Sequence, residues 1–156
     1  MPFFVGQVEI TDEDVFAEMQ YHPAGSADEA LQKAATALAV RELLLQEAAR
    51  LGIEAPDLSA DREIREDFLI TRLLEQEVET PEPDKESCLR YYDRNQKTFR
   101  DAAGNPVPFE HVQPAIAAYL KDVSWQTAVR QYLKILAGKA SIAGLSLEGA
   151  DSPLVQ

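Results

Sequence analysis

The sequence contains few of the residues from which small proteins build covalent or metal crosslinks. Cys88 is the only cysteine among 156 residues, and the two histidines, His22 and His111, lie far apart in the chain. One cysteine cannot form an intramolecular disulfide bond, and one thiol without a cluster of cysteines and histidines does not make a metal site. We therefore predict no disulfide bond, no metal ion and no cofactor, and a fold held by a hydrophobic core.

Long hydrophobic runs and a basic leader segment are also missing. The opening MPFFVGQVEI has no positive charge and only a short apolar run, and no window approaches 18 continuous apolar residues. The chain carries 27 acidic against 15 basic residues, a net charge of −12, which repels nucleic acid and anionic membranes. We expect a cytoplasmic protein with no nucleic acid or membrane partner.

No common catalytic motif occurs in the sequence. The chain has no glycine-rich phosphate loop, no H-E-x-x-H and no G-x-S-x-G. Cys88 has apolar neighbours and is expected to be a small buried hydrophobe, and His22 precedes a proline at the expected end of a helix. We predict no catalytic residues, and surfaces for binding instead of a reaction centre.

The chain does contain clear helix signals. Thr11 and Asp14 predict the start of a helix that runs to about His22, and Ser26 with Glu29 has the S-x-x-E pattern of a capping box. Gly52 followed by an apolar residue predicts the end of that second helix. Two further helices are expected at about 59–79, beginning at Ser59 or Ala60, and at 84–95 after the prolines of 80–83.

The longest predicted helix covers 108–137, ends at Gly138 and is about 45 Å long at 1.5 Å per residue. Pro114 lies about two turns inside it, so we expect a kink or a late start there. We predict one amphipathic face along the whole helix from apolar residues at three- and four-residue steps: Phe109, Val112, Ile116, Leu120, Val123, Val129, Leu133 and Leu136.

Weak alternation over Phe3–Ile10 predicts one short strand, and Ala140–Leu147, with Ile142, Leu145 and Leu147, predicts a second. These strands would pair and join the two ends of the sequence. The predicted fold is therefore mainly α, with about five helices, a long C-terminal helix and a small two-stranded sheet. We expect a single helical domain over 1–156.

The apolar surface of the predicted helices exceeds what a simple bundle consumes. The apolar face of the helix at 59–79 is wider than one neighbouring helix would bury, and aromatic side chains gather in the helix at 84–95 and after it. A groove between these faces could hold an extended peptide. The candidate peptide-binding residues are Phe68, Leu69, Leu73, Tyr91, Tyr92, Phe99, Phe109 and Tyr119.

Several stretches occur in the order found in a known family. They are GQVEITDEDV at 6–15, HPA at 22–24, VRELLLQEAARLGIEA at 40–55, TPEP at 80–83, C-x-x-Y-Y-x-x-N at 88–95 with Phe99, and VRQYLKILAGKASIAGLSLEGADSPLVQ at 129–156. Together they resemble parvulin-type peptidyl-prolyl isomerases of the NifM-like and SurA-like kind. The resemblance implies a helical chaperone domain like the N-terminal domain of SurA.

The chain departs from this family where the catalytic parvulin domain belongs. Only the short connection 100–107 stands between the N-terminal helices (1–99) and the C-terminal helix and tail (108–156), so no catalytic residue can be carried over. Either the domain is naturally absent or it was removed from a longer protein. A peptide-isomerase activity of this chain alone is the least favoured hypothesis.

The resemblance implies a chaperone-like binding module that holds extended apolar segments of client proteins during folding or maturation. The client would be an unfolded or maturing protein, and the resemblance alone points to a nitrogenase component. The alternative is a dimerisation or assembly scaffold, in which exchange of the long helix gives a helix-swapped homodimer.

Overall fold

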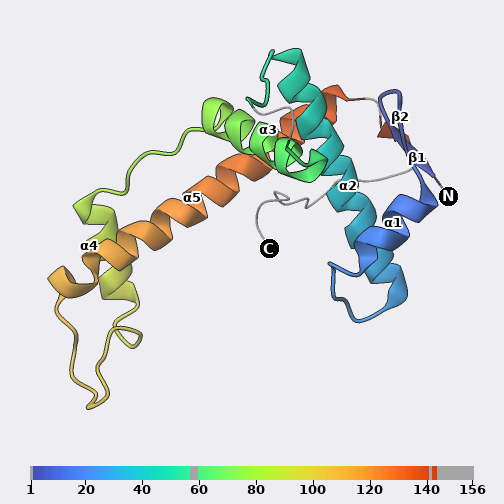
Figure 1. Ribbon diagram of the computed structural model, residues 1–156. Coiled ribbons are helices and arrows are strands. Elements are labelled where there is room, and N and C mark those ends of the chain that lie inside the picture. The colour runs from blue at the N-terminus through green and yellow to red at the C-terminus, as the bar shows by residue number, and fades with distance from the viewer. Residues whose placement is uncertain (1, 57–59, 141, 144–156) are drawn as a thin grey trace. The chain divides into compact units, whose positions relative to one another are not determined.

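Helices make up most of the chain in the computed structural model, which describes residues 2–56, 60–140 and 142–143 (Figure 1). The predicted mainly helical fold with a long C-terminal helix is confirmed. The described residues form the helices α1 (Asp12–Met19), α2 (Ala27–Arg50), α3 (Arg62–Glu77), α4 (Lys85–Arg94) and α5 (Phe109–Lys139), and the strands β1 (Phe3–Val5), β2 (Val8–Ile10) and β3 (Ile142–Ala143).

Side chains next to each N-terminus start the first two helices. Thr11 Oγ1 accepts the Asp14 N–H at 3.1 Å and Asp14 Oδ2 accepts the Thr11 N–H at 3.0 Å, which is the predicted cap. Ser26 Oγ accepts the Glu29 N–H at 3.1 Å, but the Glu29 carboxylate accepts from Gly25 instead of Ser26. The second capping box is therefore only half formed, because Glu29 reaches one residue further back.

The predicted helix ends are correct to within a few residues. Gly52 has φ 74°, and the Ile53 N–H donates to the Ala48 carbonyl oxygen at 2.9 Å, so α2 ends in the predicted left-handed cap. The helix predicted to run to His22 ends at Met19. The helix predicted from Ser59 or Ala60 begins later, at Arg62, because the Asp61 side chain caps it; Ser59 itself lies outside the described residues.

The single predicted N-terminal strand is wrong, because the chain turns back on itself within it. β1 and β2 pair antiparallel, with Val5 opposite Val8, so that only Gly6 and Gln7 form the loop. Gly6 has φ 62°, and a glycine with positive φ at the first position of a two-residue loop is typical of a tight hairpin turn. Gln46 of α2 donates to the Val5 carbonyl oxygen at 3.0 Å and holds the hairpin on the helix.

The predicted pairing of the two ends of the sequence is present in a shorter form. β3 pairs antiparallel with β1, with Val5 opposite Ile142, and gives the strand order β2-β1-β3. The sheet therefore has three strands where two were predicted, since the hairpin supplies an additional one. Leu145 and Leu147 of the predicted strand lie outside the described residues.

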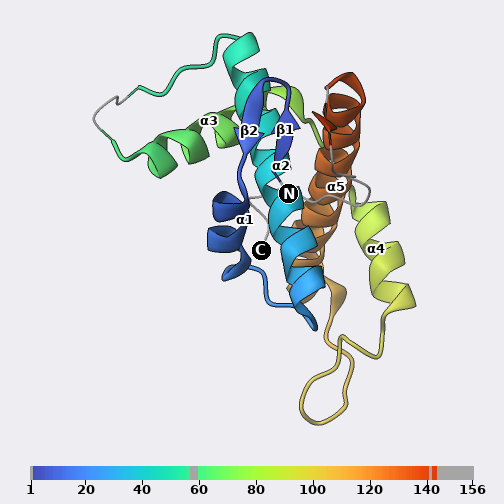
Figure 2. The same ribbon diagram turned by 90° about the vertical axis from the view of Figure 1, so that its right-hand side faces the viewer.

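Two compact units make up the structure. Unit 1 comprises the described residues of Met1–Val78 and Val129–Gln156, and unit 2 comprises Glu79–Ala128. In unit 1, α1 lies along the N-terminal half of α2 (Figure 2), and Phe3, Val5, Val15 and small residues of α2 form the core between the hairpin and these helices. The prediction of one domain over 1–156 stays a prediction.

α5 is one helix, as predicted, but its apolar residues do not form the single face that we expected. Ile116 is buried in the half that belongs to unit 2, whereas Val129 and Leu133 are buried in the half that belongs to unit 1. From Val123 to Val129 the chain advances six residues, which turns the apolar stripe by about 240° at about 100° per residue. Each half of α5 therefore buries a separate set of apolar residues, and Val123 between them stays exposed.

Pro114 falls inside α5, and the helix begins at Phe109, directly after Pro108. The expected late start is therefore wrong. No helix in the described part of the chain is both long enough and apolar enough to cross a membrane.

Candidate functional site

The structure divides the predicted peptide-binding residues between the two units. Phe68, Leu69 and Leu73 lie on α3 in unit 1. The other predicted residues lie in unit 2, on α4, on the loop after it and on the first half of α5: Tyr91, Tyr92, Phe99, Phe109 and Tyr119.

The aromatic side chains of unit 2 contact one another. Tyr92 stacks on Phe99 with a centroid distance of 5.4 Å and an interplanar angle of 26°, and it meets Phe109 edge to face at 5.5 Å. Tyr91 meets Phe99 at 6.0 Å and Tyr119 at 5.3 Å. Such pairs stabilise by about 0.5–1.5 kcal/mol beyond the burial of their area. We call these five residues the aromatic cluster.

The aromatic cluster mainly forms the core of unit 2. It packs around Cys88 and Ile116, which are buried, and Phe109 is itself buried. Cys88 is therefore the buried hydrophobe that the sequence predicts. Tyr119 is 51% exposed and is the part of the cluster most open to a ligand.

The connection 100–107 forms a closed loop on this cluster. The Val107 N–H donates to the Phe99 carbonyl oxygen at 2.9 Å, and the Tyr92 hydroxyl donates to the Val107 carbonyl oxygen at 2.6 Å. Within the loop, Asp101 Oδ1 accepts the Ala103 and Asn105 N–H groups, both at 2.9 Å. The chain therefore leaves and returns to the cluster at neighbouring positions.

The α3 residues have different environments in unit 1. Leu73 is fully buried, with Ile70 and Leu74, so it belongs to the core and offers no surface to a ligand. Phe68 is 41% exposed. Ile64, one turn before it and not among the predicted site residues, is 63% exposed.

Ile64 and Phe68 form what we call the outer face of α3. At about 100° per residue, both residues point away from Ile70, Leu73 and Leu74. Ile64 was missed although its spacing of four residues from Phe68 is a signal in the sequence. The apolar residues of α3 therefore lie on two sides of the helix, one buried and one exposed.

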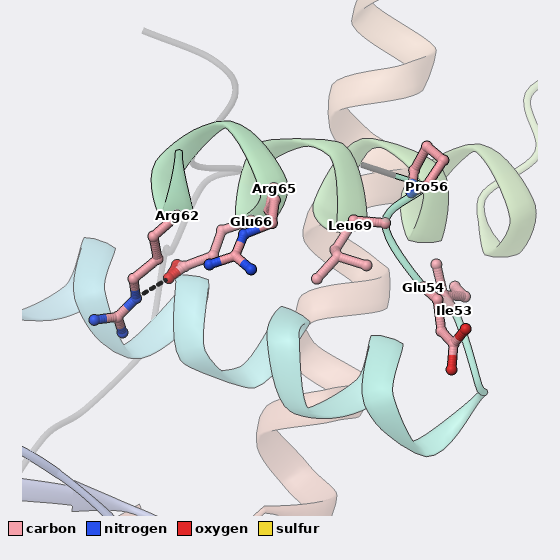
Figure 3. A pocket seen from close by; sticks show the side chains of 8 residues that line it. Ile53, Glu54, Pro56, Arg62, Arg65, Glu66 and Leu69 are labelled. Carbon is pink, nitrogen blue, oxygen red and sulfur yellow. Dashed lines mark hydrogen bonds and ion pairs between the residues drawn. The ribbon is translucent and has the colours of Figure 1, made fainter. Parts of the chain in front are cut away.

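A pocket of about 790 Å³ lies between α3 and the segment that follows α2 (Figure 3). Leu69 points from α3 toward α2, and Arg62 pairs with Glu66 at 3.0 Å on the same helix. The remaining lining residues are Ile53, Glu54, Ala55, Pro56 and Arg65. Both apolar and charged side chains line the pocket, which suits a side chain of an extended peptide.

An ion-pair network holds α3 against α2. Arg41 of α2 donates to Asp67 Oδ1 at 2.8 Å, and its Nε lies 3.6 Å from Glu66 Oε2. Glu66 is mostly buried and also pairs with Arg62, so one carboxylate joins the wall of the pocket to the helix beneath it. This network adds to the burial of Ile70, Leu73 and Leu74 in holding α3 in place.

Tyr132, on the unit 1 half of α5, carries a buried hydroxyl with no hydrogen-bond partner in the described part of the chain. Burial, together with the nearby carboxylates of Glu47 and Glu77, raises the pKa of Tyr132 to about 12, while Arg50 opposes the shift. Glu47 pairs with Arg50, which lowers the pKa of the Glu47 carboxyl group.

Tyr132→Phe is expected to leave the free energy of unfolding at pH 7 unchanged or to raise it by up to about 1 kcal/mol, because an unpaired buried hydroxyl costs desolvation energy. Since the folded-state pKa lies above the ordinary value of 10, the neutral phenol is favoured on folding. The contribution of the neutral phenol to the free energy of unfolding is fully present below pH 10 and is lost as the pH rises toward 12.

Urea unfolding at neutral pH and between pH 10 and 12 checks this expectation. Wild type should lose more stability than Tyr132→Phe over the alkaline range. Tyr21→Phe, which changes an exposed ring, is the matched control and should follow wild type. A loss of more than about 1 kcal/mol in Tyr132→Phe at pH 7 would show that the hydroxyl is hydrogen-bonded.

Among the described residues, no group of three or more histidine, cysteine, aspartate or glutamate side chains is placed to hold a metal ion. Comparison of the chain with models of protein families, with curated proteins and with solved structures found no match. The resemblance to parvulin-type isomerases therefore stays a prediction.

Proposed function

We propose that the chain is a chaperone-like binding module that holds extended apolar segments of client proteins. The outer face of α3 is the observation that carries this proposal. Ile64 and Phe68 expose apolar surface on a helix that is anchored from the opposite side by Leu73 and by the Arg41 network. The surface is thus rigid and apolar, which lowers the entropy lost when a peptide binds.

The pocket beside Leu69 supports the same function. Arg65 precedes Phe68 by three residues on α3 and also lines the pocket, so the outer face and the pocket adjoin on one helix. A client segment along α3 could place one apolar side chain in the pocket and others on Ile64 and Phe68. The client, a nitrogenase component by resemblance, would present its apolar side chains to these contacts.

The closed loop at 100–107 is consistent with the predicted relation to larger isomerases. Because Phe99 and Val107 are hydrogen-bonded neighbours, a folded domain could replace the loop tip without separating the two chain ends that flank it. In this proposal the catalytic step belongs to such a domain, and this chain supplies only binding.

The test is suppression of insulin B-chain aggregation after reduction of insulin. Wild type should reduce light scattering at a few-fold molar excess, and the double variant Ile64→Ser with Phe68→Ser should lose most of that effect, because it removes the apolar contact area. Ile135→Ser, which changes an exposed apolar side chain on α5, is the control and should behave like wild type.

Two results would contradict the proposal. One is wild type that does not suppress aggregation at any ratio. The other is a double variant that remains folded by circular dichroism and suppresses aggregation as well as wild type does.

The assembly scaffold is the second candidate, and exposed Tyr119 and Val123 on α5 favour it. They lie four residues apart on one side of the helix. In a symmetric dimer they could pack against Tyr119 and Val123 of a second copy of the chain. A monomeric mass at micromolar concentration by light scattering would remove this candidate.

A further inference from the structure

The first 32 residues of the chain carry acidic side chains without any lysine or arginine. The first basic residue is Lys33. The same segment holds half of the large apolar side chains that are exposed in the described structure: Phe4, Val8, Phe16, Tyr21 and Leu31. The acidic residues are Glu9, Asp12, Glu13, Asp14, Glu18, Asp28 and Glu29.

Contacts within the N-terminal segment account for some of these acidic residues but not for all of them. Asp14 and Glu29 accept backbone N–H groups at helix starts, and Glu18 contacts His22 at 2.9 Å. Carboxylates in a first helical turn are also favoured by the helix dipole. None of these effects requires the neighbouring apolar side chains to be exposed.

Phe16 lies where exposed apolar surface and acidic side chains occur together. It is 62% exposed, while its neighbour Val15 is buried against α2. On α1, Asp12 and Glu13 precede Phe16 by four and three residues and lie beside it on the same flank of the helix. An aromatic ring is therefore exposed beside carboxylates, and Tyr21 follows just beyond the end of the helix.

We infer that this acidic N-terminal surface, centred on Phe16 with Glu13 and Tyr21, binds a basic amphipathic segment of a partner protein. Lysine or arginine side chains of such a segment complement the carboxylates, and their aliphatic stems and apolar neighbours cover the exposed rings. A guanidinium or ammonium group can also lie on the face of Phe16 or Tyr21. This surface uses residues other than those of the outer face of α3, so it is a second binding function.

The experiment uses the full chain and two labelled 18-residue probe peptides with the same helical pattern of leucines. One peptide carries lysine and the other glutamate at all remaining positions. Fluorescence anisotropy should show that the leucine–lysine peptide binds more tightly than the leucine–glutamate peptide. Raising the salt concentration from about 0.1 M to about 1 M shortens the Debye length from about 10 Å to about 3 Å and should weaken that binding severalfold.

Point variants locate the site. Phe16→Ser should weaken binding about tenfold, as expected for the loss of one buried apolar side chain. Glu13→Gln should weaken it by a smaller factor. Ile135→Ser, at a position of comparable exposure on α5 that belongs to neither proposed binding surface, is the matched control and should leave binding unchanged.

Equal affinity for both peptides, or no binding of the leucine–lysine peptide, would overturn the inference. So would equal losses in Phe16→Ser and Ile135→Ser, because the peptide would then bind the acidic protein without a defined site. These outcomes leave the aggregation test of the outer α3 face unaffected.

Discussion

Leu73→Ala is expected to lower the free energy of unfolding of unit 1 by about 2–5 kcal/mol. Leu73 is fully buried on α3 beside Ile70 and Leu74, so truncation removes apolar contacts and leaves a cavity that the packed helices can fill only in part. Urea denaturation followed by circular dichroism at the helix band measures the change in midpoint and slope.

Phe68→Ala is the matched control for Leu73→Ala. Phe68 lies on the same helix and is part of the outer face of α3, so its truncation should cost less than about 1 kcal/mol. If Leu73→Ala were as mild as Phe68→Ala, Leu73 would be accessible, and its assignment to the core would be wrong.

Tyr92→Ala is expected to destabilise unit 2 by about 2–4 kcal/mol, because it removes a half-buried ring and a hydrogen bond together. The ring stacks on Phe99 and meets the edge of Phe109, and the hydroxyl holds the Val107 carbonyl group. Hydrogen exchange at the α4 amides is the appropriate measurement, because it reports the stability of the structure around α4 itself.

Tyr92→Phe separates the two contributions. It keeps the ring contacts and removes only the hydrogen bond to Val107, so we expect a loss of about 1 kcal/mol. If Tyr92→Ala and Tyr92→Phe changed the exchange rates equally, the aromatic cluster would not be the core of unit 2. If neither changed them, the closed loop at 100–107 would be held by its backbone alone.

The candidate site was predictable only in part. The sequence identifies α3 as having more apolar residues than one neighbour can bury, and the structure shows two sides on that helix, one buried at Leu73 and one exposed at Ile64. Periodicity alone does not say which side meets the core. Contacts between α3 and α2, which include the ion pair of Arg41 with Asp67, 26 residues further along the chain, decide that orientation.

For the aromatic residues of unit 2, the sequence suggested an exposed surface, whereas the structure places most of the rings in a core. Their number predicts a binding surface, but Tyr92, Phe99 and Phe109 mainly contact one another. A small unit such as Glu79–Ala128 has little other apolar material from which to build a core, so it uses its aromatic rings for stability.

The sequence by itself determined the features that depend on neighbouring residues. Thr11 with Asp14, Ser26, Asp84 and Gly52 mark helix boundaries because each cap is a bond within one turn of the chain. Gly6 is also a local feature, since its positive φ closes a two-residue loop. The prediction of a single strand overlooked this turn.

Only the tertiary structure decided which apolar residues are buried. The two separate stripes of α5 and the exposure of Phe16 and Ile64 depend on contacts between segments that are distant in sequence. The spacing of apolar residues in the sequence determines on which face of their helix they lie. Whether that face is buried depends on what packs against it.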